Sequence, residues 1–219
     1  MSSRIHNQME KLKQKVLALA ALVEENLAKA THAVLHDDVE AAHEVIASDP
    51  VVDAEEVDTE EECLKILALY QPVAKDLRFV VAILKLNNDL ERIGDLAVNI
   101  AEHAGRLGSH ERSRCPETLE KMIPRVRAMV HRAIDSLVQL DPDAARQVGA
   151  EDDAVDDLNR SMFEYVIEAA GRNPADLDVL IHYLSVSRYL ERIADHATNI
   201  AEDVIYMTSG EIVRHTGGG

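Results

Sequence analysis

Two copies of one acidic segment carry the residue types in this sequence that are best suited to bind a ligand. Residues 90–102 return as residues 190–202, and ten of the thirteen positions are identical. Each copy places Glu, Asp and Asn at positions i, i+4 and i+8. Carboxylate and amide oxygens are ligands for hard cations, so each copy is a candidate metal site. The six residues are Glu91, Asp95 and Asn99 in the first copy, and Glu191, Asp195 and Asn199 in the second.

The spacing puts each set on one face of a helix. An i+4 step turns a helix by about 40°, so the three side chains form a ridge with roughly 6 Å between neighbours. The apolar residues of the same segment fall on the opposite side. In the second copy these are Leu190, Ile193, Ala197, Ile200 and Val204. We therefore expect both ridges outside the bundle core, which argues against a buried di-iron centre.

A second acidic pair at i, i+4 spacing precedes each ridge. The offset between the halves is 103 residues for these pairs rather than 100, so a gap of three residues separates the two registers. Asp153 and Asp157 offer a competing register in the second half. The two pairs are Asp49 with Asp53, and Asp152 with Asp156.

The ridges also have an interpretation without metal. Acidic side chains opposite an apolar stripe often form only a solvated face, and Arg92 and Arg192 offer intrahelical ion pairs. Against this, like charges at i and i+4 repel by a few tenths of a kcal/mol, yet both halves repeat them. A divalent or trivalent cation bound across the ridge would reverse that repulsion. The spacing alone leaves both interpretations open.

Sequence motifs typical of enzymes are missing. Glu40 and His43 form one Glu-x-x-His unit, but ferritin-like di-iron proteins need such a unit on each of two helices. There is also no glycine-rich phosphate loop, no His-Glu-x-x-His motif and no nucleophile elbow. No residue is nominated as a catalytic nucleophile, and we expect the protein not to be an enzyme.

Composition narrows the class of protein further. The formal charge of the 219 residues is 23 − 40 = −17, which disfavours binding to nucleic acid or anionic lipid. Cys63 and Cys115 lie far apart and form no Cys-x-x-Cys pair. No run approaches the roughly 20 apolar residues of a membrane span. We expect a soluble cytoplasmic protein without a membrane-spanning segment.

The same composition and the hydrophobic periodicity predict an all-α fold. Hydrophobic residues make up 47%, with only nine glycines and six prolines, which suits long packed helices. A heptad pattern predicts a first helix from Ile5 to Val34. A second is expected from near Asp38, interrupted at Pro50, to about Tyr70, and a third over residues 73–103.

The plan then repeats. Helices are expected over residues 117–139, 143–170 and 175–208. This predicts two tandem three-helix bundles related by internal pseudo-symmetry. Their bounds are residues 1–108 for the first bundle, 109–116 for a linker, 117–214 for the second bundle and 215–219 for a tail.

The doubled motif resembles the PhoU family of phosphate-transport accessory and regulatory proteins. The matching residues are Leu-Glu-Arg-Ile-Gly-Asp at 90–95 with Asn-Ile-Ala-Glu at 99–102, their second copy at 190–202, and Pro72-x-x-x-Asp76-Leu-Arg78. The resemblance covers nearly the whole chain in both halves. It implies two three-helix bundles, each with two copies of an acidic-x-x-x-Asp motif that bind metal clusters on the surface.

The resemblance implies iron as the metal, whereas by their chemistry carboxylate ridges also accept zinc, manganese, magnesium or calcium. It assigns the motifs to Asp49 with Asp53, Glu91 with Asp95, Asp152 with Asp156, and Glu191 with Asp195. Three positions depart from the repeated pattern. Gly94 becomes Ala194, Asp178 stands opposite Arg78, and Pro50 lies inside the first acidic pair.

The resemblance also implies a function and partners. Family members are negative regulators of the phosphate-starvation response that link the ATPase subunit of the phosphate ABC transporter to a sensor histidine kinase. The expected location is the cytoplasm, with peripheral attachment to the inner membrane through partners, and a homodimer is one expected state. An iron-cluster enzyme and a metal-free helical adaptor are the alternatives. The sequence leaves open the metal's identity and number, direct phosphate binding and the surface each partner uses.

Overall fold

The structure is a computed structural model that describes residues 2–108 and 115–210. Six long helices and one short 3-10 helix make up these ranges, without a strand in the described part of the chain. The elements are α1 (Ser2–His36), α2 (Val39–Tyr70), α3 (Ala74–Leu107), α4 (Glu117–Gln139), α5 (Pro142–Arg172), η1 (Pro174–Asp176) and α6 (Leu177–Ser209). The prediction of an all-α protein is confirmed.

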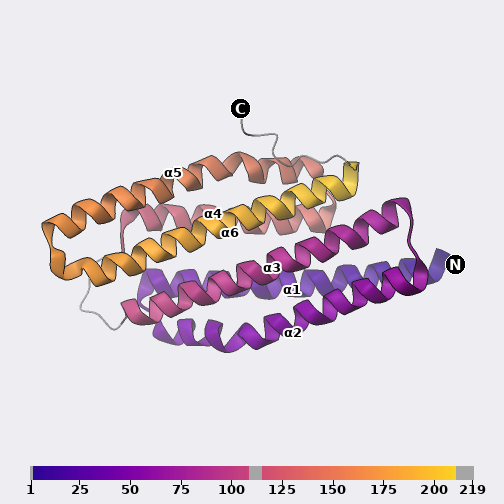
Figure 1. The fold of residues 1–219 in the computed structure, drawn as a ribbon, viewed down its shortest axis with the longest axis horizontal. Helices are drawn as coiled ribbons and strands as arrows, with labels where there is room; N and C mark the ends of the chain where they lie inside the picture. The colour runs from indigo at the N-terminus through magenta and orange to yellow at the C-terminus, as the bar shows by residue number, and fades with distance from the viewer. Residues whose placement is uncertain (1, 109–114, 211–219) are drawn as a thin grey trace.

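The helices form two three-helix bundles that lie side by side along the long axis of the molecule (Figure 1). Helices α1, α2 and α3 build one bundle, and α4, α5 and α6 build the other. The bundles meet chiefly where α3 packs on α6, and α1 contacts α4 beside them. The helices that carry the two acidic ridges, α3 and α6, therefore lie at the centre of the molecule.

The heptad positions of α1 are buried, as their spacing predicts. Leu12, Val16, Leu19 and Val23 are completely buried in the core. At the end of α1 the backbone of Asp37 turns to a positive φ of 55°, and the Asp38 carboxylate caps α2 by accepting from the Ala41 amide at 3.0 Å. The second helix, expected from near Asp38, thus begins with Asp38 as its N-cap.

The predicted interruption at Pro50 is wrong. Helix α2 continues through Pro50 from Val39 to Tyr70. A proline inside a helix removes one backbone hydrogen bond and crowds the carbonyl four residues earlier. Pro50 is exposed, and buried Val45 and Val52 hold the helix on the bundle before and after it. Packing therefore offsets the cost of the proline.

The other helix predictions agree with the structure to within a few residues. The predicted sixth helix opens with η1, which precedes α6. Within the predicted linker and tail, residues 109–114 and 215–219 lie outside the described residues, so the proposed domain bounds stay predictions. No helix in the described ranges is long and apolar enough to cross a membrane.

Candidate metal-binding ridges

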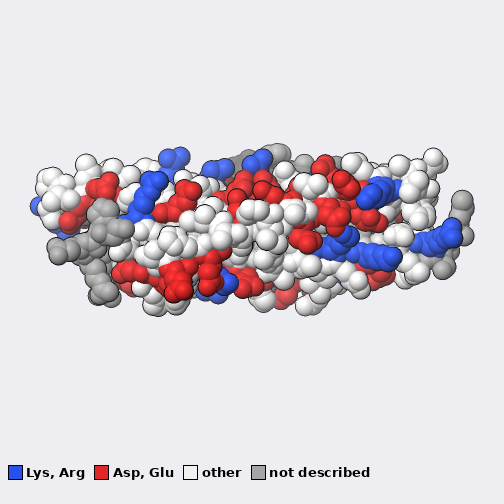
Figure 2. Space-filling view, turned by 90° about the horizontal axis from the view of Figure 1, so that it is seen from below, with Lys and Arg blue, Asp and Glu red and all other residues white. Residues whose placement is uncertain are grey.

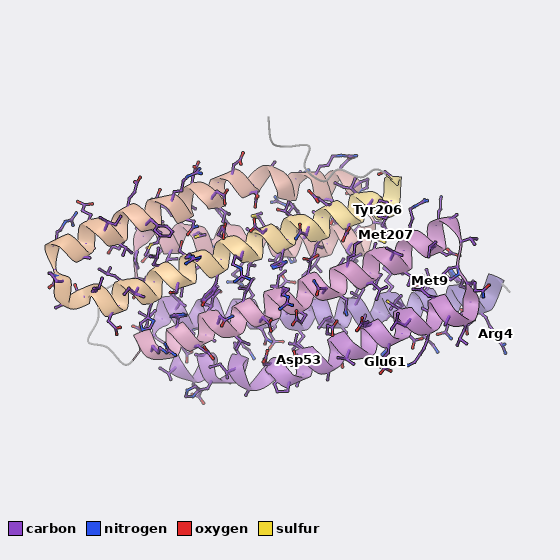
Figure 3. The ribbon with its side chains drawn as sticks, in the orientation of Figure 1. Arg4, Met9, Asp53, Glu61, Tyr206 and Met207 are labelled. Atoms are coloured by element: carbon purple, nitrogen blue, oxygen red, sulfur yellow. The ribbon has the colours of Figure 1, made fainter. Side chains whose placement is uncertain are left out.

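The first ridge gains ligands from a second helix. Helix α2 packs along α3, and this brings Asp49 and Asp53 of α2 to Asp95 of α3. One carboxylate oxygen from each of the three lies within 4.8 Å of the others. Asp53 projects from the middle of α2 (Figure 3). Among the residues that the structure describes, this is the one group of three acidic, histidine or cysteine side chains gathered so closely.

Mutual repulsion marks this group of three carboxylates. Partial burial raises the pKa of Asp49, and the charges of Asp53 and Asp95 raise it further. Burial also raises the pKa of Glu91, with Asp95 as the next contributor. Acidic side chains are spread along the face that α2 helps to form, with Lys and Arg between them along its length and the largest group of Lys and Arg toward one end (Figure 2). A hard cation would relieve this repulsion, so the donor set fits such an ion.

Arg92 partly neutralises the same ridge from its own helix. Its Nε lies 3.3 Å from Oε2 of Glu91, and its terminal NH1 lies 3.3 Å from Oδ2 of Asp95. These are the intrahelical ion pairs that the sequence offered as an alternative to metal. The arginine is half-exposed, so such pairs stabilise the helix by only a few tenths of a kcal/mol.

Glu56 is a neighbour that the spacing argument missed. It lies on α2, seven residues after Asp49, and accepts a hydrogen bond from Nδ2 of buried Asn87 at 2.8 Å. Burial raises its pKa, and Glu60 and Asp53 raise it further. The i, i+7 relation to Asp49 could have identified it, because that step also returns to the same face of a helix.

The second ridge is built in the same way from α5 and α6. Burial raises the pKa of Asp152 to about 6, with Asp195 and Asp156 as the next causes. The pKa of Glu191 is raised by burial and then by Asp156 and Asp152. The pKa of Asp195 is raised by burial and then by the charges of Glu191 and Asp156. All four predicted carboxylates of this half therefore act on one another across the two helices.

Asp153 and Asp157, which form the competing register in the second half, have other partners or weaker effects. Asp157 forms an ion pair with Arg160, one turn along α5. The charge of Asp153 also raises the pKa of Asp152, but by less than the charges of Asp195 and Asp156 do. The arrangement favours Asp152 and Asp156 as the counterparts of Asp49 and Asp53.

The two asparagines of the repeated motif have different partners. Asn99 donates from Nδ2 to the backbone carbonyl of Asp95 at 2.9 Å. Asn199 instead reaches from α6 to α3, where its Nδ2 lies 3.4 Å from Oδ1 of buried Asp89. The structure therefore keeps Asn99 beside its ridge and turns Asn199 toward the junction between the bundles.

The first copy of the repeated segment has Gly94 where the second has Ala194, and helix packing explains the glycine. A Cβ atom at Gly94 would lie 3.1 Å from Cγ1 of Val52, which is buried on α2. Glycine thus lets α2 approach α3 closely, between Asp49 and Asp53 on one side and Asp95 on the other. This close approach helps to gather the three carboxylates.

Comparison with known proteins agrees with the doubled architecture. The family model described as the PhoU domain matches residues 16–104 and again residues 119–204. These two matches fall in α1–α3 and in α4–α6 and together cover most of the chain. The chain belongs to the PhoU family.

Individual PhoU relatives match over nearly their whole length. A phosphate-specific transport system accessory protein PhoU homolog of Aquifex aeolicus is 40% identical, over 97% of this chain and 96% of its own. The accessory protein PhoU of Serratia marcescens is 34% identical, over 99% of this chain and 89% of its own.

Solved PhoU structures have the same fold. The crystal structure of PhoU from Pseudomonas aeruginosa superposes with a TM-score of 0.91 at 33% identity, covering 94% of this chain and 99% of its own. The phosphate transport system regulatory protein PhoU from Streptococcus pneumoniae gives 0.86 at 28% identity, covering 95% and 99%. The predicted family and the predicted tandem bundles are confirmed.

Proposed function

We propose that this PhoU protein is a non-enzymatic regulator of phosphate uptake that represses the phosphate-starvation response. It would do so by linking the ATPase subunit of the phosphate ABC transporter to a sensor histidine kinase in the cytoplasm, with peripheral attachment to the inner membrane through these partners. The observation that carries the proposal is the end-to-end similarity to proteins named as accessory to phosphate-specific transport. A homodimer is part of the proposal.

The two ridges are the proposed metal sites, and iron is the proposed metal, with zinc, manganese and magnesium as alternatives. Asp49, Asp53, Glu91, Asp95 and Asn99 would hold metal on the first ridge. On the second ridge the residues are Asp152, Asp156, Glu191 and Asp195, whereas Asn199, also predicted as a ligand, donates to Asp89 at the junction between the bundles. Support comes from Asp49 and Asp152, whose pKa values are raised by burial and then by neighbouring carboxylates, because a bound cation would supply the positive charge that these surroundings lack. Metal would then set the charge of the surface that a partner contacts.

A metal-free helical adaptor is the second candidate. The ion pairs of Arg92 with Glu91 and Asp95 favour it, because they neutralise part of the first ridge without metal. The double variant Glu91→Gln with Asp95→Asn separates the two candidates. Unchanged repression by this variant would support the adaptor, whereas constitutive expression of the starvation response would support a metal-dependent regulator.

The link to partners has a direct test. Purified wild-type protein is mixed with the transporter ATPase subunit, and separately with the cytoplasmic part of the kinase, from the same organism. We expect both to be retained on the immobilised protein. Retention of neither would contradict the proposed function, and hydrolysis of a generic phosphate ester would revive an enzymatic role.

A further inference from the structure

Two histidines lie one turn apart at the end of α1, where the chain passes into α2. His32 and His36 are both exposed, and their imidazole rings stack with centroids 4.1 Å apart. This α1–α2 junction lies at the end of the first bundle opposite the N-terminus (Figure 1). Residues at i and i+4 share one face of a helix, and two histidines at this spacing are able to bind one metal ion.

A carboxylate from the next helix faces the same pair. Oδ2 of Asp38 lies 3.7 Å from Nε2 of His32. This distance is longer than a hydrogen bond, which spans about 2.7–3.2 Å. It is close to the separation of two ligand atoms on a tetrahedral zinc ion, which is about 3.4 Å for bonds of about 2.0–2.2 Å. His32, His36 and Asp38 therefore offer two imidazoles and one carboxylate, a set of ligands that zinc takes.

Hydrogen bonds to the backbone orient two of these three side chains. Nδ1 of His36 lies 3.0 Å from the backbone carbonyl oxygen of His32. Because a carbonyl oxygen only accepts, this nitrogen carries the proton, and Nε2 of His36 keeps a lone pair for a metal. Oδ1 of Asp38 accepts from the Ala41 amide at 3.0 Å, while Oδ2 faces His32. Metal-binding imidazoles and carboxylates typically have such contacts behind them.

The three donor atoms are spread more widely than the carboxylates of the first ridge. Both imidazoles are exposed and Asp38 is half-buried, so rotation of the side chains closes the set on an ion. Lys29, three residues before His32, is paired with Glu25 and Glu44. The positive charge of this lysine is therefore balanced and does not oppose a cation at the α1–α2 junction.

The second bundle shows that a junction of this kind folds without histidines. Its counterpart lies between α4 and α5, where Asp141 caps α5 as Asp38 caps α2. Counted back from these two caps, Asp135 and Gln139 stand where the first bundle has its histidines. The cap is therefore repeated and accounts for Asp38 by itself, whereas the two imidazoles are particular to the first bundle and need another explanation.

We propose that His32, His36 and Asp38 bind a zinc ion that joins the end of α1 to the start of α2. Three protein ligands leave the fourth tetrahedral position to water. The imidazole nitrogens distinguish this site from the ridges, which offer oxygen ligands alone. The inference goes beyond the proposed function and does not depend on it, because it holds whether or not the ridges bind metal or a partner.

The test titrates the metal-free full-length protein with zinc chloride. Calorimetry counts the ions and gives their affinities, and the imidazole proton signals in NMR identify the histidines that bind them. His32→Gln and His36→Gln each remove one ligand. Asp38→Asn removes the carboxylate but keeps a side chain that caps a helix equally well. His43→Gln is the matched control, because His43 is an exposed histidine of α2 outside the proposed site.

We expect the three ligand variants to lose one bound zinc ion, or to bind that ion at least about tenfold more weakly than wild type does. The control should match wild type. The imidazole signals of His32 and His36 should shift when zinc is added, while the signal of His43 stays in place. Zinc that binds to the ridges is present in every variant, so the comparison isolates the α1–α2 junction. Thermal unfolding without metal checks that each variant folds.

Three results would overturn the proposal. Equal zinc binding by wild type and by both histidine variants would show that the histidines are not ligands. Unshifted signals of His32 and His36 in zinc-saturated wild type would show the same, even if the variants bound less zinc. Binding at the junction only at millimolar zinc would mark an adventitious ion on surface histidines. None of these results bears on the retention of partners, so the proposed function stands or falls separately.

Discussion

Nδ1 of His196 on α6 lies 2.8 Å from Oδ1 of Asp89 on α3. The pair joins the two bundles at their main contact, and the same Asp89 oxygen also receives Asn199. Asp89 is only 8% exposed, so its carboxylate depends on these partners in place of water. This junction lies close to both ridges, since Asp89 stands two residues before Glu91 and His196 directly follows Asp195.

Asp89→Ala should destabilise the protein by about 2 kcal/mol, because it leaves the half-buried imidazole of His196 without its acceptor. Urea unfolding at pH 7 measures the change. Asn88→Ala is the control, since Asn88 is exposed beside it and should change stability by less than about 0.5 kcal/mol. Equal stability of the Asp89 variant and wild type would mean that the pair contributes nothing to holding the bundles together.

Gly94→Ala should lower stability by up to about 2 kcal/mol although alanine is the better helix former. Alanine gains about 1 kcal/mol in helix propensity, but its Cβ would press on buried Val52, and overpacking costs about 1–3 kcal/mol. The double variant Gly94→Ala with Val52→Ala should show less loss than the two single changes add up to. A strictly additive double-mutant cycle would contradict the close approach of α2 to α3.

The accuracy of the sequence predictions depended on whether the deciding interaction was local. Glu91 and Asp95 share a ridge because residues four apart lie on one face of a helix, and the start of α2 near Asp38 follows from the capping side chain of Asp38. Pro50 was misjudged because its tolerance depends on burial of Val45 and Val52 against other helices. The partner of Asn199 depends on how α6 packs on α3, and a single sequence does not contain that contact.

Asp152 should make folding less favourable as pH rises. Its pKa is raised from 3.8 to about 6 in the folded protein, so the folded state binds its proton more tightly than the unfolded chain does. The stabilising effect of that proton is present below pH 4 and is lost by pH 6–7. In metal-free protein, Asp152→Asn should therefore stabilise by on the order of 1 kcal/mol at pH 7.5 and by nothing at pH 3.5, because a bound cation would itself remove the repulsion. Chemical unfolding at both pH values is the measurement, and a larger gain at the lower pH would contradict the assigned repulsion.

The His103–His182 pair should make folding more favourable as pH rises, the opposite of Asp152. Their Nδ1 atoms lie 2.7 Å apart across α3 and α6, and burial, His182 and Arg106 lower the pKa of His103 from 6.5 to about 4. The neutral imidazole stabilises the fold above pH 6.5, and this contribution is lost as pH falls toward 4. His103→Gln keeps a hydrogen-bonding side chain without that titration. This variant should reduce the stability that is lost between pH 6.5 and pH 4 by about 1–2 kcal/mol. His43→Gln, an exposed control, should leave the pH dependence unchanged.

Metal content tests the ridges most directly. Protein purified without chelator or affinity metal should carry several ions per chain in elemental analysis, with iron first among the metals sought. Asp49→Asn with Asp53→Asn should reduce the first site, and Asp152→Asn with Asp156→Asn the second, because each removes two of the carboxylates that face one another. Asp143→Asn is the control, since Asp143 is exposed on α5 and paired with Arg146 away from both ridges.

Wild-type protein that stays metal-free even after iron is added back would leave the ridges as partner-binding or solvated surfaces. Membership in the PhoU family would stand, because it rests on the whole-chain match rather than on the metal.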